Sequence, residues 1–119
     1  MRSILIIEDD HDTRVSMRSA LEHEGYFVIS APNGRDALDL LRKMTPPSMV
    51  LLDINMPLMN GEEFLKTFRK QPQWASIPVA QISGEQDKSL PGTCYSFKKP
   101  LDLSKLLDAI KACLTGQNS

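Results

Sequence analysis

The sequence has little cysteine, no excess of basic charge and no long hydrophobic run, and each lack excludes a class of protein. Its 119 residues include only two cysteines, Cys94 and Cys113, which form neither a disulfide framework nor a metal-ligand spacing. We expect both to be buried or inert thiols. The formal net charge of −1 provides no positive field for a phosphate backbone or an anionic lipid surface, so nucleic acid is not an expected direct partner.

A membrane segment is also not expected. The apolar run near the N-terminus, residues 4–7, is followed by three acidic residues and is too short for a signal peptide, and no later run approaches about 20 apolar residues. The chain has no long linker, repeat or low-complexity segment, and its length suits a single core. We therefore expect one domain, residues 1–119, in a soluble, cytoplasmic protein.

The hydrophobic pattern alternates between strand and helix along the whole chain. Continuous apolar runs predict strands buried on both faces, and apolar residues at helical spacing predict amphipathic helices between them. The predicted strands are 3–7, 27–30, 49–52, 77–83 and 95–97. The predicted helices are 13–24, capped by Asp12, one opened by Asn33 and Gly34, 62–70, and a last one capped by Asp102. This order indicates an α/β protein with a parallel sheet and helices on both faces.

Polar and charged residues follow the predicted strands at the point where each strand ends. Because parallel α/β sheets bind ligands at the carboxyl ends of their strands, these side chains should converge on one edge of the sheet. The residues concerned are Glu8, Asp9 and Asp10 after the first strand, Asp53 after the third, Ser83 and Gly84 after the fourth, and Lys98 and Lys99 after the fifth.

This set of side chains suits phosphoryl transfer. Glu8, Asp9 and Asp53 would repel one another unless a divalent cation such as Mg²⁺ lay between them. A lysine and a small hydroxyl residue can bind the oxygens of a phosphoryl group, and an aspartate can accept that group as an aspartyl phosphate. The sequence contains neither GxxxxGK[ST] nor GxGxxG, so a nucleotide is not the expected phosphate carrier.

The ordered set of motifs resembles the receiver domain of bacterial two-component response regulators. The resemblance rests on Glu8-Asp9, on Asp53 with the Asn-Met-Pro that begins at Asn55, on Gly61, on Ser83-Gly84 and on Lys99-Pro100, and it covers nearly the whole chain. It implies a flavodoxin-like, doubly wound sheet of five parallel strands in the order 2-1-3-4-5.

The resemblance also implies a role for each matching residue. Asp53 would be the phosphoacceptor, and Glu8, Asp9, Asp53 and the backbone carbonyl of Asn55 would hold Mg²⁺ or Mn²⁺. Ser83 and Lys99 would contact the phosphoryl group, and Pro100 would follow a cis peptide bond. The implied donor is a sensor histidine kinase or a histidine phosphotransfer protein, and the receiver would catalyse its own phosphorylation and dephosphorylation without a separate substrate.

The segment between Ser83 and Lys99 departs from the family. Its fifteen residues, 84–98, must supply the fifth strand and two loops, and Pro91 and Gly92 interrupt it, so we expect the fourth helix to be reduced or absent. The position where the family usually carries a switch aromatic holds Ser96, and strand alternation places Tyr95 and Phe97 together on the opposite face. We therefore expect that signalling uses another surface, such as the first helix, or that this segment becomes ordered only on phosphorylation.

Two other functions compete with a phosphorylated receiver that signals through protein-protein interaction. One is a receiver-like scaffold that is never phosphorylated, which the intact acidic pair, Asp53, Ser83 and Lys99 oppose. The other is a metal-dependent phosphatase with an aspartyl-phosphate intermediate. That class needs a second aspartate two positions after the nucleophile, where this chain has Asn55, and it needs a larger chain.

Overall fold

The structure, a computed structural model, describes residues 2–54, 61–84, 90, 92–99 and 101–116. Within these residues, five strands alternate with four α-helices and one short 3-10 helix. The strands are β1 (Ser3–Ile7), β2 (Phe27–Ala31), β3 (Met49–Asp53), β4 (Val79–Ser83) and β5 (Tyr95–Lys98). The helices are α1 (His11–His23), α2 (Gly34–Leu41), α3 (Gly61–Arg69), η1 (Pro72–Trp74) and α4 (Leu103–Gly116).

The five strands form one parallel sheet in the order β2-β1-β3-β4-β5. This confirms the predicted flavodoxin-like topology. The central strands β1, β3 and β4 are almost completely buried, as continuous apolar sequences require when both faces of a sheet are covered.

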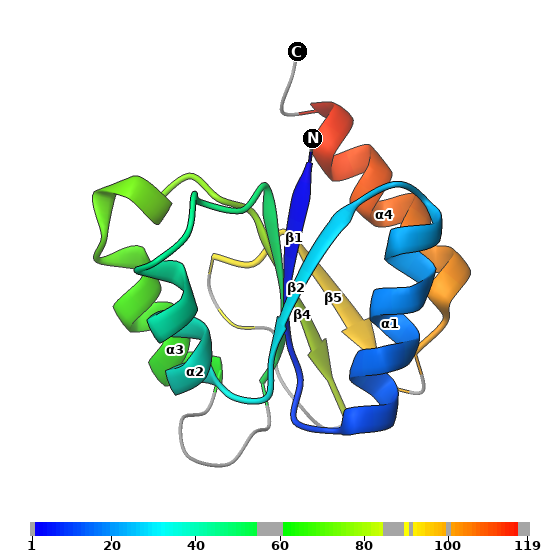
Figure 1. Ribbon diagram of the computed structural model, residues 1–119, viewed down its shortest axis with the longest axis horizontal. Helices are drawn as coiled ribbons and strands as arrows, with labels where there is room; N and C mark the ends of the chain where they lie inside the picture. Colours follow the sequence, from blue (N-terminus) through cyan, green and yellow to red (C-terminus); the bar gives the residue numbers. More distant parts are fainter. Residues whose placement is uncertain (1, 55–60, 85–89, 91, 100, 117–119) are drawn as a thin grey trace.

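Helices cover both faces of the sheet, with α2 and α3 on one side and α1 and α4 on the other (Figure 1). Residues that alternate along each strand therefore enter two separate cores. Leu5 and Leu52 pack on the α2-α3 side, and Ile4 and Leu51 on the α1-α4 side. In the part of the chain that the structure describes, no helix is long and apolar enough to cross a membrane.

Two predicted boundaries were wrong by two residues, and several others differ from the structure by one residue. Helix α1 begins at His11 and its N-cap is Asp10, not Asp12, because the Asp10 carboxylate accepts hydrogen bonds from the Thr13 backbone N–H at 2.9 Å and from the Thr13 hydroxyl at 2.6 Å. Strand β4 begins at Val79 instead of Ile77. The N–H of Ile77 donates to the carbonyl of Trp74 at the end of η1, and Pro78 has no N–H to donate to a neighbouring strand.

The connection between β4 and β5 contains no helix in its described residues, which agrees with the expected reduction of the fourth helix; residues 85–89 and 91 lie outside the description. Two polar side chains hold this connection. The buried Gln81 amide donates to Ser96 Oγ at 3.2 Å and accepts from the Leu90 N–H at 2.6 Å. The Arg69 guanidinium donates to the carbonyl of Gly92 at 3.0 Å and to three carbonyls at and after η1.

Candidate functional site

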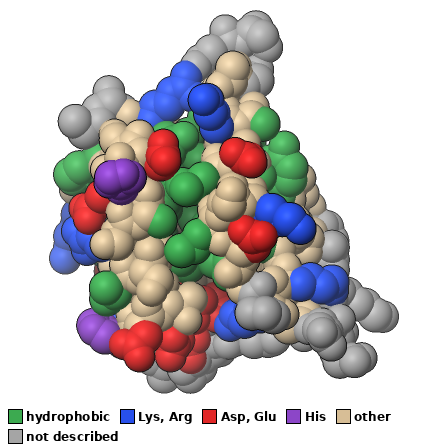
Figure 2. Space-filling view, turned by 90° about the vertical axis from the view of Figure 1, so that its right-hand side faces the viewer, with side chains coloured by type: hydrophobic (Ala, Val, Ile, Leu, Met, Phe, Trp, Pro, Cys, Tyr) green, Lys and Arg blue, Asp and Glu red, His purple; other side chains and the backbone are tan. Residues whose placement is uncertain are grey.

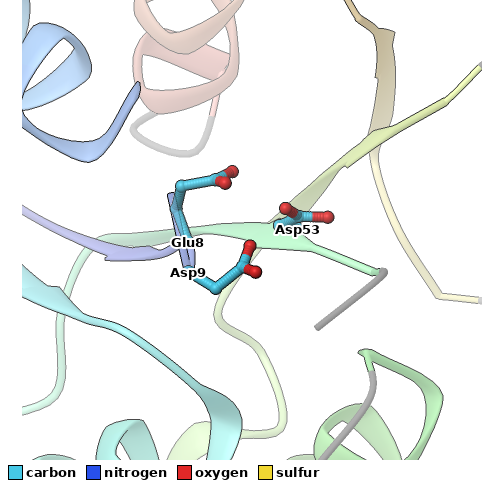
Figure 3. A group of neighbouring side chains, drawn as sticks. All are labelled: Glu8, Asp9 and Asp53. Carbon is cyan, nitrogen blue, oxygen red and sulfur yellow. The ribbon is translucent and has the colours of Figure 1, made fainter. Parts of the chain in front are cut away.

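Three carboxylates meet at the carboxyl ends of β1 and β3. Glu8 and Asp9 directly follow β1, and Asp53 is the last residue of β3. Figure 3 shows the three side chains pointing toward one another, and a carboxylate oxygen from each lies within 4.8 Å of the other two. Glu8 and Asp53 are fully buried, whereas Asp9 is exposed. The cluster therefore has two carboxylates in the protein interior and one at the solvent boundary.

Lys99 brings a positive charge to this cluster from the end of β5. Its Nζ lies 3.0 Å from Asp53 Oδ2 and 3.9 Å from Glu8 Oε1. The Lys99 backbone N–H donates to the Ser83 carbonyl at 2.8 Å, so the ends of β4 and β5 position the lysine. Burial alone would lower the pKa of Lys99, but the hydrogen bond and charge of Asp53, with the charges of Glu8 and Asp9, outweigh burial and raise it. Lys99 is therefore a firmly protonated ammonium.

Two buried polar atoms at the site have no hydrogen-bond partner among the described residues: Glu8 Oε2 and Ser83 Oγ. Both residues are fully buried, and leaving a polar atom unpaired in the interior costs about 1–3 kcal/mol. A cation at the acidic cluster would satisfy the free oxygen of Glu8. An anionic group on Asp53 would offer an acceptor to the Ser83 hydroxyl. The residues present therefore fit both a divalent cation and a bound phosphoryl group.

The electrostatics of Glu8 also fit a cation. Burial, followed by the negative charge of Asp53, raises the pKa of Glu8 from its usual 4.5 to about 7. Lys99 and the Asp10 N–H, which donates to Glu8 Oε1 at 3.2 Å, offset only part of that increase. A divalent ion would favour the ionised carboxylate and remove the repulsion that now disfavours it.

Neighbouring residues hold the acidic segment between β1 and α1, residues 8–10, through contacts that the sequence did not indicate. Arg14 Nη1 donates to the Glu8 carbonyl at 2.8 Å from the first turns of α1. Asp10, the N-cap, has a lowered pKa because the Thr13 side chain and backbone both donate to it, so it stays ionised beside the site. An arginine seven residues after the end of a strand carries no recognisable signal in a single sequence, and only the helix start at His11 brings it back to Glu8.

Other predicted site residues fall outside the cluster or outside the description. Asn55 and Pro100 both lie outside the described residues. Lys98 is exposed, and its backbone position pairs with Ser83 across the β4-β5 ladder. His11 and His23 are also exposed, as expected.

An apolar groove adjoins the site on the face that carries α1 and α4. Figure 2 shows hydrophobic side chains along this face with acidic side chains gathered at its lower edge. The groove has a volume of about 420 Å³, and its lining includes Lys99. It is lined by Asp12, Thr13, Ser16, Met17, Ile82, Lys99, Leu101 and Leu103. A molecule in this groove would therefore contact a residue that also binds Asp53.

An acidic cluster, a lysine and a hydroxyl at the carboxyl ends of the strands of a parallel α/β domain are the arrangement expected of a phosphoacceptor signalling domain. The chain belongs to the response regulator receiver domain family, whose family model matches residues 4–111. It is thus a receiver, the phosphoacceptor module of two-component signalling, and the scaffold and phosphatase alternatives are not favoured.

Two curated relatives match almost over their full length. The chain is 33% identical over 115 residues to the sporulation initiation phosphotransferase F of Bacillus subtilis, covering 93% of this chain and 92% of that protein. It is 29% identical over 119 residues to the polar-differentiation response regulator DivK of Brucella anthropi, covering 95% and 96%.

Solved structures show the same fold. The chemotaxis response regulator CheY4 of Vibrio cholerae has a TM-score of 0.86 at 28% identity, covering 94% of this chain and 98% of that chain. The signal receiver domain of a histidine kinase from Syntrophus aciditrophicus has a TM-score of 0.85 at 28% identity, covering 98% and 92%. Receiver domains bind Mg²⁺ at an acidic pocket and interact with histidine kinases or phosphotransferases.

Proposed function

We propose that residues 1–119 act as one receiver domain in which Asp53 accepts a phosphoryl group from a phosphohistidine. The observation that carries this proposal is the pairing of Lys99 Nζ with Asp53 Oδ2 at 3.0 Å. At the end of the neighbouring strand β4, the buried Ser83 hydroxyl has no hydrogen-bond partner among the described residues. Asp53 is fully buried at the carboxyl end of β3, the edge of the sheet at which parallel α/β proteins bind ligands.

The reaction follows from this geometry. A carboxylate oxygen of Asp53 attacks phosphorus, the P–N bond to the donor histidine breaks with its electron pair going to nitrogen, and the donor leaves as neutral imidazole because its ring carries a proton taken up from solvent. Lys99 exchanges its bond with Asp53 Oδ2 for the phosphoryl oxygens, and the Ser83 hydroxyl donates to one of them. Hydrolysis resets the domain: water attacks phosphorus and releases inorganic phosphate, which restores the Asp53 carboxylate.

Glu8, Asp9 and Asp53 would hold a divalent cation, Mg²⁺ or Mn²⁺, and the backbone carbonyl of Asn55 would complete the protein ligands. When bound, the cation neutralises the charge that develops on the phosphoryl oxygens. The orphaned Glu8 Oε2 and the hard oxygen donors of all three carboxylates support this assignment.

The donor would be a sensor histidine kinase or a histidine phosphotransfer protein. The similarity to a sporulation initiation phosphotransferase supports a place in a phosphorelay, where the phosphoryl group is passed onward. Output would then arise from transfer to, or binding of, another protein.

Incubation with acetyl phosphate and Mg²⁺, followed by intact mass measurement, tests the proposal. Wild-type protein should gain one phosphoryl group, and Asp53→Asn should gain none. Asp39→Asn is the matched control, because Asp39 is an exposed aspartate on α2 paired with Arg42, and it should be phosphorylated like wild type. EDTA should abolish the adduct in every sample.

The other outcomes identify the competing functions. A wild-type protein without adduct, which nevertheless binds Mg²⁺, would be a receiver-like scaffold. Rapid turnover of a phosphomonoester such as p-nitrophenyl phosphate would instead indicate a phosphatase. An adduct that persists in Asp53→Asn would place the phosphoacceptor elsewhere.

A further inference from the structure

The two cysteines are neighbours in space, although 19 positions separate them in the sequence. Cys94 Sγ and Cys113 Sγ lie 3.8 Å apart, and both are free thiols. Cys94 is exposed and Cys113 is half-buried, so solvent reaches the pair. The expectation of burial was therefore wrong for Cys94, which is exposed, and the two sulfur atoms are in contact; that the thiols are inert stays a prediction.

Regular secondary structure holds both cysteines in place. The Cys94 N–H donates to the Val79 carbonyl at 2.8 Å, which fixes it at the beginning of the β4-β5 ladder. Cys113 lies near the end of α4, next to Leu114, and packs against the core on that side of the sheet. A disulfide needs an S–S distance of about 2.05 Å, so the sulfur atoms must approach by about 1.8 Å for the bond to form.

We propose that Cys94 and Cys113 form a redox modification site that low-molecular-weight disulfides of the glutathione type convert into an intramolecular disulfide. One cysteine thiolate attacks a sulfur of oxidised glutathione and releases a glutathione thiolate, leaving a mixed disulfide on the protein. The second cysteine thiolate then attacks the protein sulfur and releases a second glutathione. Two protein thiols are oxidised, one glutathione disulfide is reduced, and both protons pass to the released thiolates.

The surroundings of the pair set its reactivity. Although Cys94 is exposed, the protein removes part of the water around its thiol, and this partial desolvation, followed by the neighbouring Cys113, raises the pKa of Cys94 to about 11, so this thiol is protonated at neutral pH. Because exchange proceeds through the thiolate, oxidation should be slow near neutral pH and faster as the pH rises. The pair therefore responds to sustained oxidation and not to a brief exposure.

The crosslink would join the start of β5 to the last turns of α4, while Lys99 follows the other end of β5. The modification site is thus separate from the acidic cluster and uses none of its residues. It gives the domain a second covalent input, on the strand that also positions Lys99. Disulfide formation is measured without any phosphodonor, so this inference can fail independently of the proposed phosphorylation.

The test uses the reduced full chain, incubated with a series of ratios of oxidised to reduced glutathione and quenched by alkylation under denaturing conditions. Wild type should lose both alkylatable thiols together, become lighter by two hydrogen atoms and remain monomeric on a non-reducing gel. Closing this loop should also raise Tm by about 10 °C, and dithiothreitol should reverse the increase. Cys94→Ser and Cys113→Ser are matched controls, which should each accept one glutathionyl group and show no such increase.

Three results would overturn the inference. One is a wild-type protein that carries two glutathionyl groups, because the thiols would then react independently. Another is a disulfide-linked dimer as the main product. The third is retention of both free thiols at glutathione ratios that glutathionylate the two single-cysteine variants, since accessibility would then not be the obstacle.

Discussion

The metal-free domain should become less stable as the pH rises from about 5 to 8, and Mg²⁺ should reverse this loss. The perturbed group is Glu8, whose carboxyl is fully buried beside Asp53. In the unfolded chain this carboxyl ionises near 4.5, whereas in the folded domain its pKa is about 7.

The sign follows from the proton count in the two states. Between these two pKa values, the folded domain keeps a proton that the unfolded chain has released, so the free energy of unfolding decreases with rising pH. The contribution is fully present below 4.5 and is lost as the pH passes about 7. The difference between the two pKa values corresponds to about 3 kcal/mol. Lys99 and Asp10 titrate outside this window, because the pKa of the lysine is raised and that of the aspartate is lowered.

Urea denaturation in EDTA at several pH values measures the effect, with Glu8→Gln as the comparison. The variant keeps a neutral side chain of the same shape at every pH, so its stability should vary with pH by about 3 kcal/mol less than that of wild type. At pH 8, saturating Mg²⁺ should stabilise wild type more than Glu8→Gln, because the cation needs the ionised carboxylate. Parallel pH profiles for the two proteins in EDTA would refute the reasoning, since the buried carboxyl would then not be the titrating group.

Two further predictions concern the stability of the fold. Asp10→Ala should lower Tm by about 4 °C, because helix α1 loses its N-cap. The control Asp12→Ala should lower Tm by less than half as much. Equal decreases of Tm in thermal denaturation would contradict the assignment of Asp10 as the cap. Arg69→Ala should lower the free energy of unfolding, measured by urea denaturation, by about 2 kcal/mol, because four backbone carbonyls lose a charged donor. Arg69→Lys should recover only a small part of this loss, because lysine cannot donate to all four carbonyls. Full recovery by lysine would show that the positive charge of Arg69, and not its set of hydrogen bonds, provides the stability.

The fold was predictable because the strands are short apolar runs that end on polar residues. A parallel sheet aligns the carboxyl ends of its strands, so Glu8, Asp53, Ser83 and Lys99 could be assigned to one edge without coordinates. The boundaries were less predictable. The sequence Asp-Asp-His-Asp offers several acidic caps within one turn, and only the bonds of Thr13 distinguish Asp10 from Asp12.

Contacts between distant segments were not predictable in the same way. No spacing rule links Cys94 to Cys113, because their proximity depends on how far α4 extends back along the sheet after β5. Gln81 is a polar residue within an apolar run, which signals a buried partner without naming it. The partners, Ser96 and Leu90, are fixed only by the course of the β4-β5 connection.

Strand β5 is where these contacts combine. It is the edge strand beside β4, and most of its residues are exposed, so it has less apolar burial to hold it than any central strand. Hydrogen bonds at three levels attach it to β4: Cys94 at its start, Ser96 in its middle and Lys99 at its end. A phosphoryl group on Asp53 would change the contacts of Lys99, at the end of the strand. A disulfide would change the contacts of Cys94, at its start. Because the strand between Cys94 and Lys99 is short and weakly buried, we infer that each modification changes the stability of the whole strand. Phosphorylation and disulfide formation would then both affect β5.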